Sequence, residues 1–186
     1  MMQYSQLQPS PESISTSDMS YGFDIKTPPS STGLAPWCVS ECQFPIFGDV
    51  AEKLKYCVRY AILAPSSHNT QPWRFAATRN QIALYADRTR SLPVVDPNDR
   101  ELIISCGAAL ANLSIAIRHF GYSGKLTLCP QPDNTDQIAI VELGQEHHPN
   151  RDDEVLFQTI PMRRTNRNAY EDTPISRSLF RELRMI

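Results

Sequence analysis

The sequence predicts an α+β fold in which helices and a mainly antiparallel sheet pack around one long central helix. Helical and strand-like patterns are interspersed along the chain, and two pairs of strand patterns are joined by short polar turns. Residues 99–120 carry an apolar stripe at helical spacing. With 186 residues, the chain is long enough to build one hydrophobic core.

The first helix is expected to follow an N-terminal tail. Residues 1–45 are rich in Ser, Pro and Gln and show little hydrophobic periodicity, so we expect a mostly disordered tail that contributes little to the core. Asp49, with Glu52 three residues later, resembles a capping box. The helix after it ends at Pro65 and carries an apolar stripe of Leu54, Cys57, Val58, Ala61 and Ile62.

Two strands and the central helix are expected next. Residues 74–77 and 81–86 have strand patterns around a turn at Arg79 and Asn80. The long helix is expected over residues 99–120, with Gly121 as its stop. Alanines 108, 111 and 116 make several of its faces small, which is typical of a central, closely packed helix. Its main apolar stripe is Leu102, Cys106, Ala109, Leu110, Leu113, Ile117 and Phe120.

The last third of the chain contains two more strand patterns and two helical ones. Strands are expected over residues 125–129 and 137–143, followed by a polar linker over 145–152. A helix over 153–162, weakened at its end by Pro161, should turn inward Val155, Leu156, Thr159 and Ile160. A short helix is expected over 178–185. We expect His119 to interact with a helix dipole, and His147 and His148 to lie in solvent.

Composition excludes several classes of function. The net charge of −2 and the 41% of hydrophobic residues point to neither nucleic acid nor an anionic membrane as a partner. No apolar run is expected to approach the roughly 20 residues of a membrane span, and no signal peptide is recognised. The five scattered cysteines argue against a disulfide framework, and Cys38 and Cys42 lack a second pair of zinc ligands. A cytoplasmic protein without a metal site is expected.

Residues 64–75 form the most distinctive local motif, Ala-Pro-Ser-Ser-His-Asn-Thr-Gln-Pro-Trp-Arg-Phe. Its two prolines and its run of hydroxyl and amide side chains fix a polar loop between a helix and a strand. Loops held in this way commonly bind ligands. The alternative is a connection whose polar side chains satisfy only their own backbone. Trp73 is expected to anchor the core.

A second motif, at residues 163–167, reads Arg-Arg-Thr-Asn-Arg. Arginines form charge-assisted and often bidentate bonds with phosphate oxygens, and Thr165 adds a hydroxyl. The alternative is a solvated basic end of a helix, where arginines also favour the local dipole.

Together, the two motifs resemble the nitroreductase family of FMN-dependent oxidoreductases. The resemblance runs from about Phe47 to Ile186. In that family the arginine element lies upstream of the first helix, whereas here residues 39–48 contain no arginine and the element lies downstream. This order resembles the Acg-type subgroup, in which two nitroreductase-like halves are fused. It implies a tail over residues 1–45, a first module over 46–150, and the opening of a second module, cut early, over 151–186.

The resemblance implies a cofactor, a reaction and partners. FMN would carry the chemistry, taking electrons from NAD(P)H and passing them to a nitro- or quinone-like small-molecule acceptor, with no catalytic side chain or metal. The alternative is a flavin-binding or flavin-sequestering remnant with little turnover. Family proteins form dimers with FMN at the interface, so a homo-oligomer is expected. The implied cofactor-binding residues are Pro65, Ser66, Ser67, Asn69, Gln71, Arg163, Arg164, Thr165 and Arg167.

Overall fold

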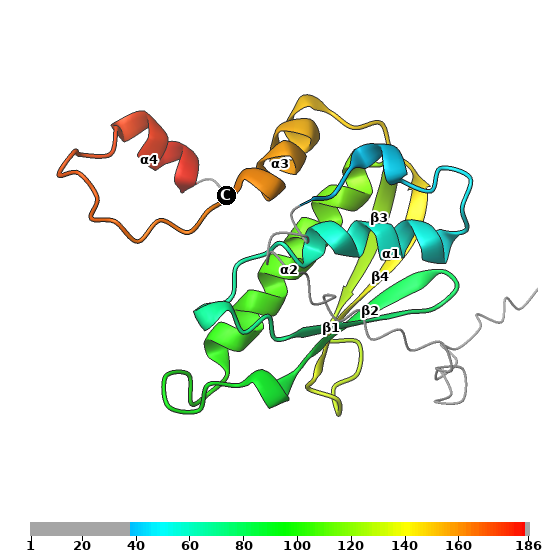
Figure 1. Cartoon of the computed structure of the whole chain (residues 1–186), viewed down its shortest axis with the longest axis horizontal. Coiled ribbons are helices and arrows are strands. Elements are labelled where there is room, and N and C mark those ends of the chain that lie inside the picture. Colours follow the sequence, from blue (N-terminus) through cyan, green and yellow to red (C-terminus); the bar gives the residue numbers. More distant parts are fainter. Residues whose placement is uncertain (1–37, 185–186) are drawn as a thin grey trace, which may run out of the picture.

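A computed structural model describes residues 38–184 of the chain. Its regular elements are four helices, four strands and three short 3-10 turns (Figure 1). In chain order they are η3 (Glu41–Gln43), α1 (Val50–Ala61), η4 (Ser67–Asn69), β1 (Trp73–Ala77), β2 (Gln81–Ala86), η5 (Arg88–Arg90), α2 (Arg100–His119), β3 (Tyr122–Leu128), β4 (Gln137–Glu146), α3 (Arg151–Met162) and α4 (Arg177–Leu183).

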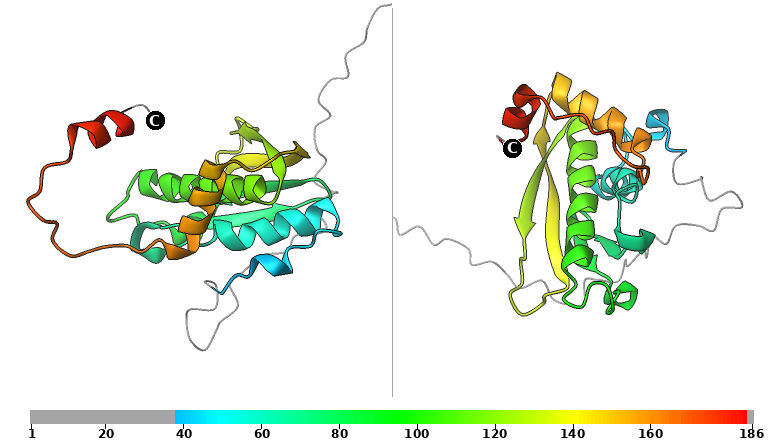
Figure 2. Two further views of the ribbon diagram at one scale, coloured as in Figure 1. Left: turned by 90° about the horizontal axis from the view of Figure 1, so that it is seen from above. Right: turned by 90° about the vertical axis from the view of Figure 1, so that its left-hand side faces the viewer.

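The four strands form one antiparallel sheet in the order β1-β2-β4-β3. Both expected hairpins are present, although β3 begins three residues earlier than predicted and β4 extends through Glu146 into the expected linker. Helices α1 and α2 lie together on one face of the sheet (Figure 2). The α+β prediction is therefore confirmed, and the core lies between this sheet face and the two helices.

Helix α1 begins where its sequence predicted. The side chain of Asp49 accepts a hydrogen bond from the Glu52 backbone N–H, and the Glu52 side chain accepts one from the Asp49 N–H, which completes the capping box. Leu54, Cys57 and Val58 are buried, as the periodicity indicated. Burial raises the pKa of the Cys57 thiol to about 12, so this thiol is an inert core group.

The central helix α2 matches its predicted range to within one residue at each end. Gly121 follows it with a φ of 88°, a left-handed conformation that glycine adopts without steric cost. By length and composition alone, α2 would pass as a membrane span, which corrects the expectation that no run approached that length. Its contacts with α1, α3 and the sheet are those of a core helix.

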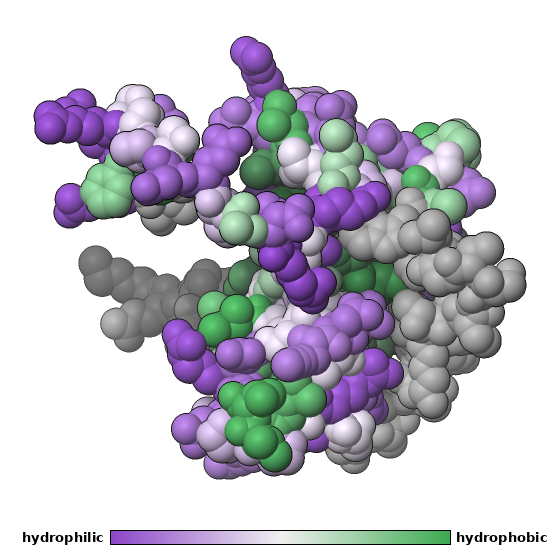
Figure 3. Space-filling view, turned by 60° about the vertical axis from the view of Figure 1, so that its left-hand side comes forward, coloured by the Kyte–Doolittle hydropathy of each residue, from purple (hydrophilic) through white to green (hydrophobic). Residues whose placement is uncertain are grey.

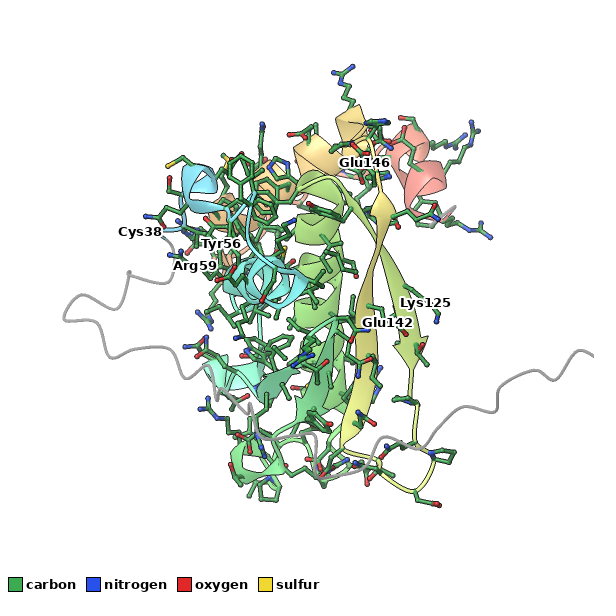
Figure 4. All side chains as sticks on the ribbon, turned by 90° about the vertical axis from the view of Figure 1, so that its right-hand side faces the viewer. Cys38, Tyr56, Arg59, Lys125, Glu142 and Glu146 are labelled. Atoms are coloured by element: carbon green, nitrogen blue, oxygen red, sulfur yellow. The ribbon has the colours of Figure 1, made fainter. Side chains whose placement is uncertain are left out.

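Residues 38–45 correct the expected extent of the tail. Val39 and Phe44 pack against the core, and the Phe44 ring stacks on Phe120 with centroids 4.0 Å apart. The Tyr56 hydroxyl donates a hydrogen bond to the Ser40 carbonyl. Figure 4 shows Cys38 at the same edge of the molecule as Tyr56 and Arg59 of α1. The expected tail therefore contributes to the core over these residues, and the rest of it, residues 1–37, lies outside the described part.

Helix α3 confirms one of the four residues predicted to face inward, Ile160, and corrects the other three. Its buried residues are Asp153, Phe157 and Ile160, whereas Val155, Leu156 and Thr159 are exposed. Because α3 packs on α2, it extends the core of the preceding residues. An extended strap over residues 163–176 then leads to α4 (Figure 1). Leu179 and Phe180 of α4 are exposed. The proposed module boundary near residue 150 stays a prediction.

Candidate functional site

The motif at residues 64–75 connects α1 to β1 and contacts α2 through η4. Its two ends are buried: Ala64 packs in the core on one side, and Pro72 and Trp73 on the other. Trp73 is only 8% exposed, which confirms its predicted role as a core anchor. Between these anchors, Pro65, His68 and Asn69 are exposed. The sequence thus places a polar turn between two fixed points of the core.

The backbone of this loop is left-handed at three non-glycine residues. The φ angles are 51° at His68, 56° at Asn69 and 49° at Gln71. Such conformations cost on the order of 1 kcal/mol or more for each residue, and they persist only where the surroundings hold them. Asn and His tolerate them better than Gln does. This concentration of strain marks the loop as a functional candidate.

Part of the support comes from the loop itself. The Asn69 N–H donates to the Ser66 carbonyl and the Thr70 N–H to the Ser67 carbonyl, each at 3.0 Å. The Ser66 Oγ accepts a hydrogen bond of 2.9 Å from the Gln71 N–H. Of the side-chain bonds to the loop's own backbone that the alternative required, the structure shows the one from Ser66 and none from the amides of Asn69 and Gln71 among the described residues.

The rest of the support comes from two charged residues that sequence analysis missed. The Ser67 hydroxyl donates to Glu101 Oε2 of α2 at 2.6 Å. An Nη1 donor of Arg90, from η5, reaches the Thr70 carbonyl at 2.9 Å and the Gln71 carbonyl at 3.3 Å. The Arg90 guanidinium is in turn 3.4 Å from the Asp87 carboxylate. Residues this far from the loop in sequence carry no local pattern that would link them to it.

The side-chain amides of Asn69 and Gln71 are the groups that the loop leaves available. Asn69 is exposed and Gln71 half-buried, and within residues 38–184 no hydrogen bond is recorded for either amide. Each amide offers two donors and an acceptor. This donor set suits the polar edge of a planar ring or a polyhydroxyl chain.

The arginine motif lies elsewhere, at the start of the strap. Arg163 directly follows α3, and its Nη1 lies 3.3 Å from the Thr165 hydroxyl, while Arg164 donates to the Pro161 carbonyl at 2.8 Å. Thr165 and Arg167 are exposed. Among the described residues, no recorded contact joins this segment to the 66–71 loop, so the structure does not bring the two predicted halves of the site together.

Apolar side chains are exposed just before α2 and in its first turns. Val94 and Val95 lie in the connection before α2, and Ile103 and Ile104 lie in its first two turns. We call these four residues the α2 patch. Figure 3 shows apolar surface among charged side chains on the face turned forward in that view. Contiguous apolar surface commonly marks an interface, so these exposed side chains are candidates for one.

A second polar cluster lies at the other end of α2. The buried Asp153 carboxylate accepts hydrogen bonds of 2.8 Å from Arg118 Nε and 2.9 Å from His147 Nε2. The hydrogen bond from His147 lowers the pKa of Asp153, and Arg118 adds to the effect. This contact corrects the expectation that His147 lies in solvent. Arg118 and His147 line a shallow cleft of about 290 Å³ beside β3.

His119 was expected to interact with a helix dipole, and the structure also gives it an aromatic partner and two carboxylate partners. Its ring stacks on Phe157 at 3.5 Å between centroids, and its two nitrogens lie 3.1 Å from Glu41 and 3.2 Å from Glu154. It therefore joins the N-terminal segment to α3. In the part of the chain that the structure describes, no group of His, Cys, Asp and Glu has the arrangement of a metal site.

Comparison with known proteins identifies relatives of this chain. Over 125 residues it is 36% identical to "Putative NAD(P)H nitroreductase Rv3131" of Mycobacterium tuberculosis H37Rv, a match that covers 67% of this chain and 36% of the relative. Over 121 residues it is 30% identical to "Putative NAD(P)H nitroreductase acg" of the same strain, covering 65% and 37%. The chain thus spans little more than a third of these relatives. No protein-family model matches it.

Solved structures give a weaker likeness. A structure described as a putative nitroreductase in complex with FMN, from Exiguobacterium sibiricum 255-15, superposes with a TM-score of 0.42 at 16% identity. The match covers 67% of this chain and 92% of that one. A similarity of this size carries no further argument.

Proposed function

Because this chain belongs to the nitroreductase family, we propose that it is an FMN-dependent oxidoreductase that passes electrons from NAD(P)H to a nitro- or quinone-like acceptor. The observation that supports this most strongly is the left-handed loop at residues 66–71. The Ser66 hydroxyl and Arg90 bond its backbone, Glu101 bonds its Ser67 hydroxyl, and the amides of Asn69 and Gln71 have no recorded partner among the described residues.

The chain's own residues would bind and orient the flavin. Asn69, Gln71 and the hydroxyls of Ser66 and Ser67 offer the donors and acceptors that the ring edge and the ribityl chain require, and Pro65 limits the freedom of the loop. Bound FMN would accept a hydride from the nicotinamide and return electrons to the acceptor. No side-chain nucleophile is required for that chemistry.

We propose that the arginine motif holds the FMN phosphate. Arg163, Arg164 and Arg167 supply charge-assisted donors, and Thr165 adds a hydroxyl. Since no recorded contact joins this motif to the 66–71 loop, the phosphate contacts require either a movement of the exposed strap or the arginines of a second copy. We therefore also propose self-association, for which the α2 patch is the candidate surface.

The experiment is flavin reconstitution followed by turnover. The purified chain should show the absorbance bands of bound flavin, and the cofactor released on denaturation should be FMN. Steady-state oxidation of NADH and NADPH should then be measured with a nitroaromatic and with a quinone. A chain that shows no flavin bands after incubation with excess FMN would contradict the proposal.

The second candidate is a flavin-binding protein with little turnover. The observation that favours it is the separation of the arginine motif from the loop, in a chain that spans little more than a third of its relatives. Bound flavin without oxidation of either nicotinamide would support this candidate over the first.

A further inference from the structure

We propose that Arg90 and Glu101 are positioning residues that hold the 66–71 loop in its flavin-binding conformation. We further propose that Glu101 makes the Ser67 hydroxyl a hydrogen-bond acceptor toward the flavin. Both inferences rest on the proposed function. Neither residue belongs to the two motifs that the sequence singled out.

Arg90 acts on the part of the loop that its own backbone does not hold. Within the described residues, no backbone N–H donates to the Thr70 or Gln71 carbonyl, and the Arg90 guanidinium reaches both. Thr70 lies between two left-handed residues, Asn69 and Gln71, so these carbonyls occur where the backbone is most strained. The charge-assisted bonds from Arg90 therefore stabilise the left-handed conformation of the loop against more relaxed backbone conformations.

Glu101 acts through the single proton of the Ser67 hydroxyl. A serine hydroxyl has one donor and two acceptor lone pairs. The contact of 2.6 Å to a carboxylate, which can only accept, commits that proton to Glu101. The Ser67 oxygen can then only accept, from the ring N–H or from a ribityl hydroxyl. The Ser66 hydroxyl has the opposite role. Its oxygen accepts a hydrogen bond from the Gln71 N–H, and its proton remains available to donate to the flavin.

The structure also supplies a matched control for Arg90. Arg88 lies in the same turn and makes bonds of similar kind, but its partners are Asp99 and Asp136, and none of its recorded bonds reaches the loop. A substitution of Arg88 therefore disturbs the turn without removing a recorded contact to residues 66–71.

The test combines flavin titration with hydrogen exchange in the full chain. Arg90→Ala should weaken FMN and riboflavin by about 10-fold each, since the charge-assisted contacts of Arg90 to two loop carbonyls are lost and both flavins share the groups that the loop contacts. Without flavin, the peptide over residues 66–72 should exchange faster than in the wild type. Arg88→Ala should change neither quantity. Glu101→Ala should weaken both flavins, and Glu101→Gln, whose amide oxygen can still accept from Ser67, should recover most of that loss.

The outcomes separate this inference from the proposed function. If the wild type binds flavin, and Arg90→Ala leaves both affinities and the exchange of the loop unchanged, the positioning role of Arg90 is wrong. Equal flavin binding in Glu101→Ala and in the wild type would overturn the role of Glu101. A wild type that binds neither flavin would overturn the proposed function instead, and exchange of the loop peptide would then decide whether these residues hold it.

Discussion

At the scale of single residues, Asp153 shows how one buried carboxylate fixes the geometry around it. It is 5% exposed and accepts hydrogen bonds from Arg118 of α2, from His147 after β4 and from the Asn150 N–H. A buried carboxylate is tolerated only when its charge is compensated in this way. Asp153 therefore ties three separate segments of the chain together.

We expect Asp153→Asn to lower the free energy of unfolding by about 1–3 kcal/mol at pH 7, because the charged partner of Arg118 is lost. The loss stays within this range because water still solvates the exposed part of Arg118. Folding lowers the pKa of Asp153 below its value in the unfolded chain, which is about 4. The ionised carboxylate therefore contributes its full stabilisation above about pH 4, and this stabilisation is lost as the pH falls through the lower pKa of the folded state. Denaturant unfolding of both proteins at pH 7 and below pH 4 measures this, and the difference should shrink in acid.

Asp152 provides the control for this prediction. It lies in the same turn of α3 but is exposed, so Asp152→Asn should change the stability by about 0.5 kcal/mol or less at either pH. An equal loss in both variants would show that the helix dipole, and not the buried pair, is responsible.

Arg164 tests the proposed phosphate contact. A hydrogen bond to a charged group contributes about 1.5–3 kcal/mol, so Arg164→Ala should weaken FMN by roughly 10- to 150-fold. Riboflavin, which lacks the phosphate, should bind nearly as before. Titration of both flavins measures this, and an equal response would show that the arginines are not the phosphate site. The selective loss of FMN distinguishes this variant from Arg90→Ala.

At the scale of elements, the side of α3 that faces the core differs from the side that its apolar residues predicted. The three buried residues, Asp153, Phe157 and Ile160, follow the spacing of one helical face. Asp153 places that face against Arg118 of α2, and Phe157 then packs against Tyr60 and His119. The inward face of α3 therefore combines this pair, in which only Asp153 is buried, with two apolar side chains, Phe157 and Ile160.

We expect Phe157→Ala to destabilise the protein by about 3–5 kcal/mol, since it removes a ring that is only 2% exposed and leaves a cavity among aromatic neighbours. Val155→Ala, at a position 52% exposed in the same helix, should cost about 0.5 kcal/mol or less. Thermal or urea unfolding measures both. A larger loss of stability in Val155→Ala than in Phe157→Ala would show that the face predicted from periodicity is the buried one.

The N-terminal segment gives a second test at this scale. Phe44 stacks on Phe120 and meets the edge of Tyr56, so Phe44→Ala should cost about 1–2 kcal/mol, in keeping with a ring that is only partly buried. Phe47, three residues later, is fully exposed, and Phe47→Ala should leave the unfolding midpoint nearly unchanged. Identical midpoints for the two variants would mean that residues 38–45 contribute nothing to stability.

At the scale of the whole molecule, the distribution of apolar surface is uneven. The core lies on one face of the sheet, while the α2 patch, the strap and α4 expose Val94, Ile104, Ile175 and Phe180. A molecule with this much apolar surface outside its core is expected to bury part of it against another surface.

We therefore expect self-association at tens of micromolar, roughly the range in which interfaces of ordinary size assemble. Ile104→Asp should shift the sedimentation coefficient toward the monomer, because it places a charge in the α2 patch. Ile46→Asp, at another exposed isoleucine that lies before α1 and outside the α2 patch, should leave it unchanged. A monomeric wild type at these concentrations would contradict the proposal.

Much of the fold could be predicted because its signals are local. The capping box at Asp49, the stripe of α2 and the glycine after it depend on residues within a few positions of one another. Strand patterns likewise predicted both hairpins, since each pairs neighbours in sequence. The loop motif and the arginine motif were also evident, because short runs of particular side chains carry them.

Tertiary structure decided what depends on distant residues. The buried face of α3 follows from Arg118, 35 positions before Asp153, and the conformation of the 66–71 loop follows from Arg90 and Glu101. The expected face was chosen from apolar side chains alone, so it could not include Asp153, and Phe157, which is apolar, was missed. The sequence by itself therefore determined which elements form and which loop is polar. Only the packed chain determined which charged residues support that loop, because their bonds to a hydroxyl and to two carbonyls join residues that are distant in sequence.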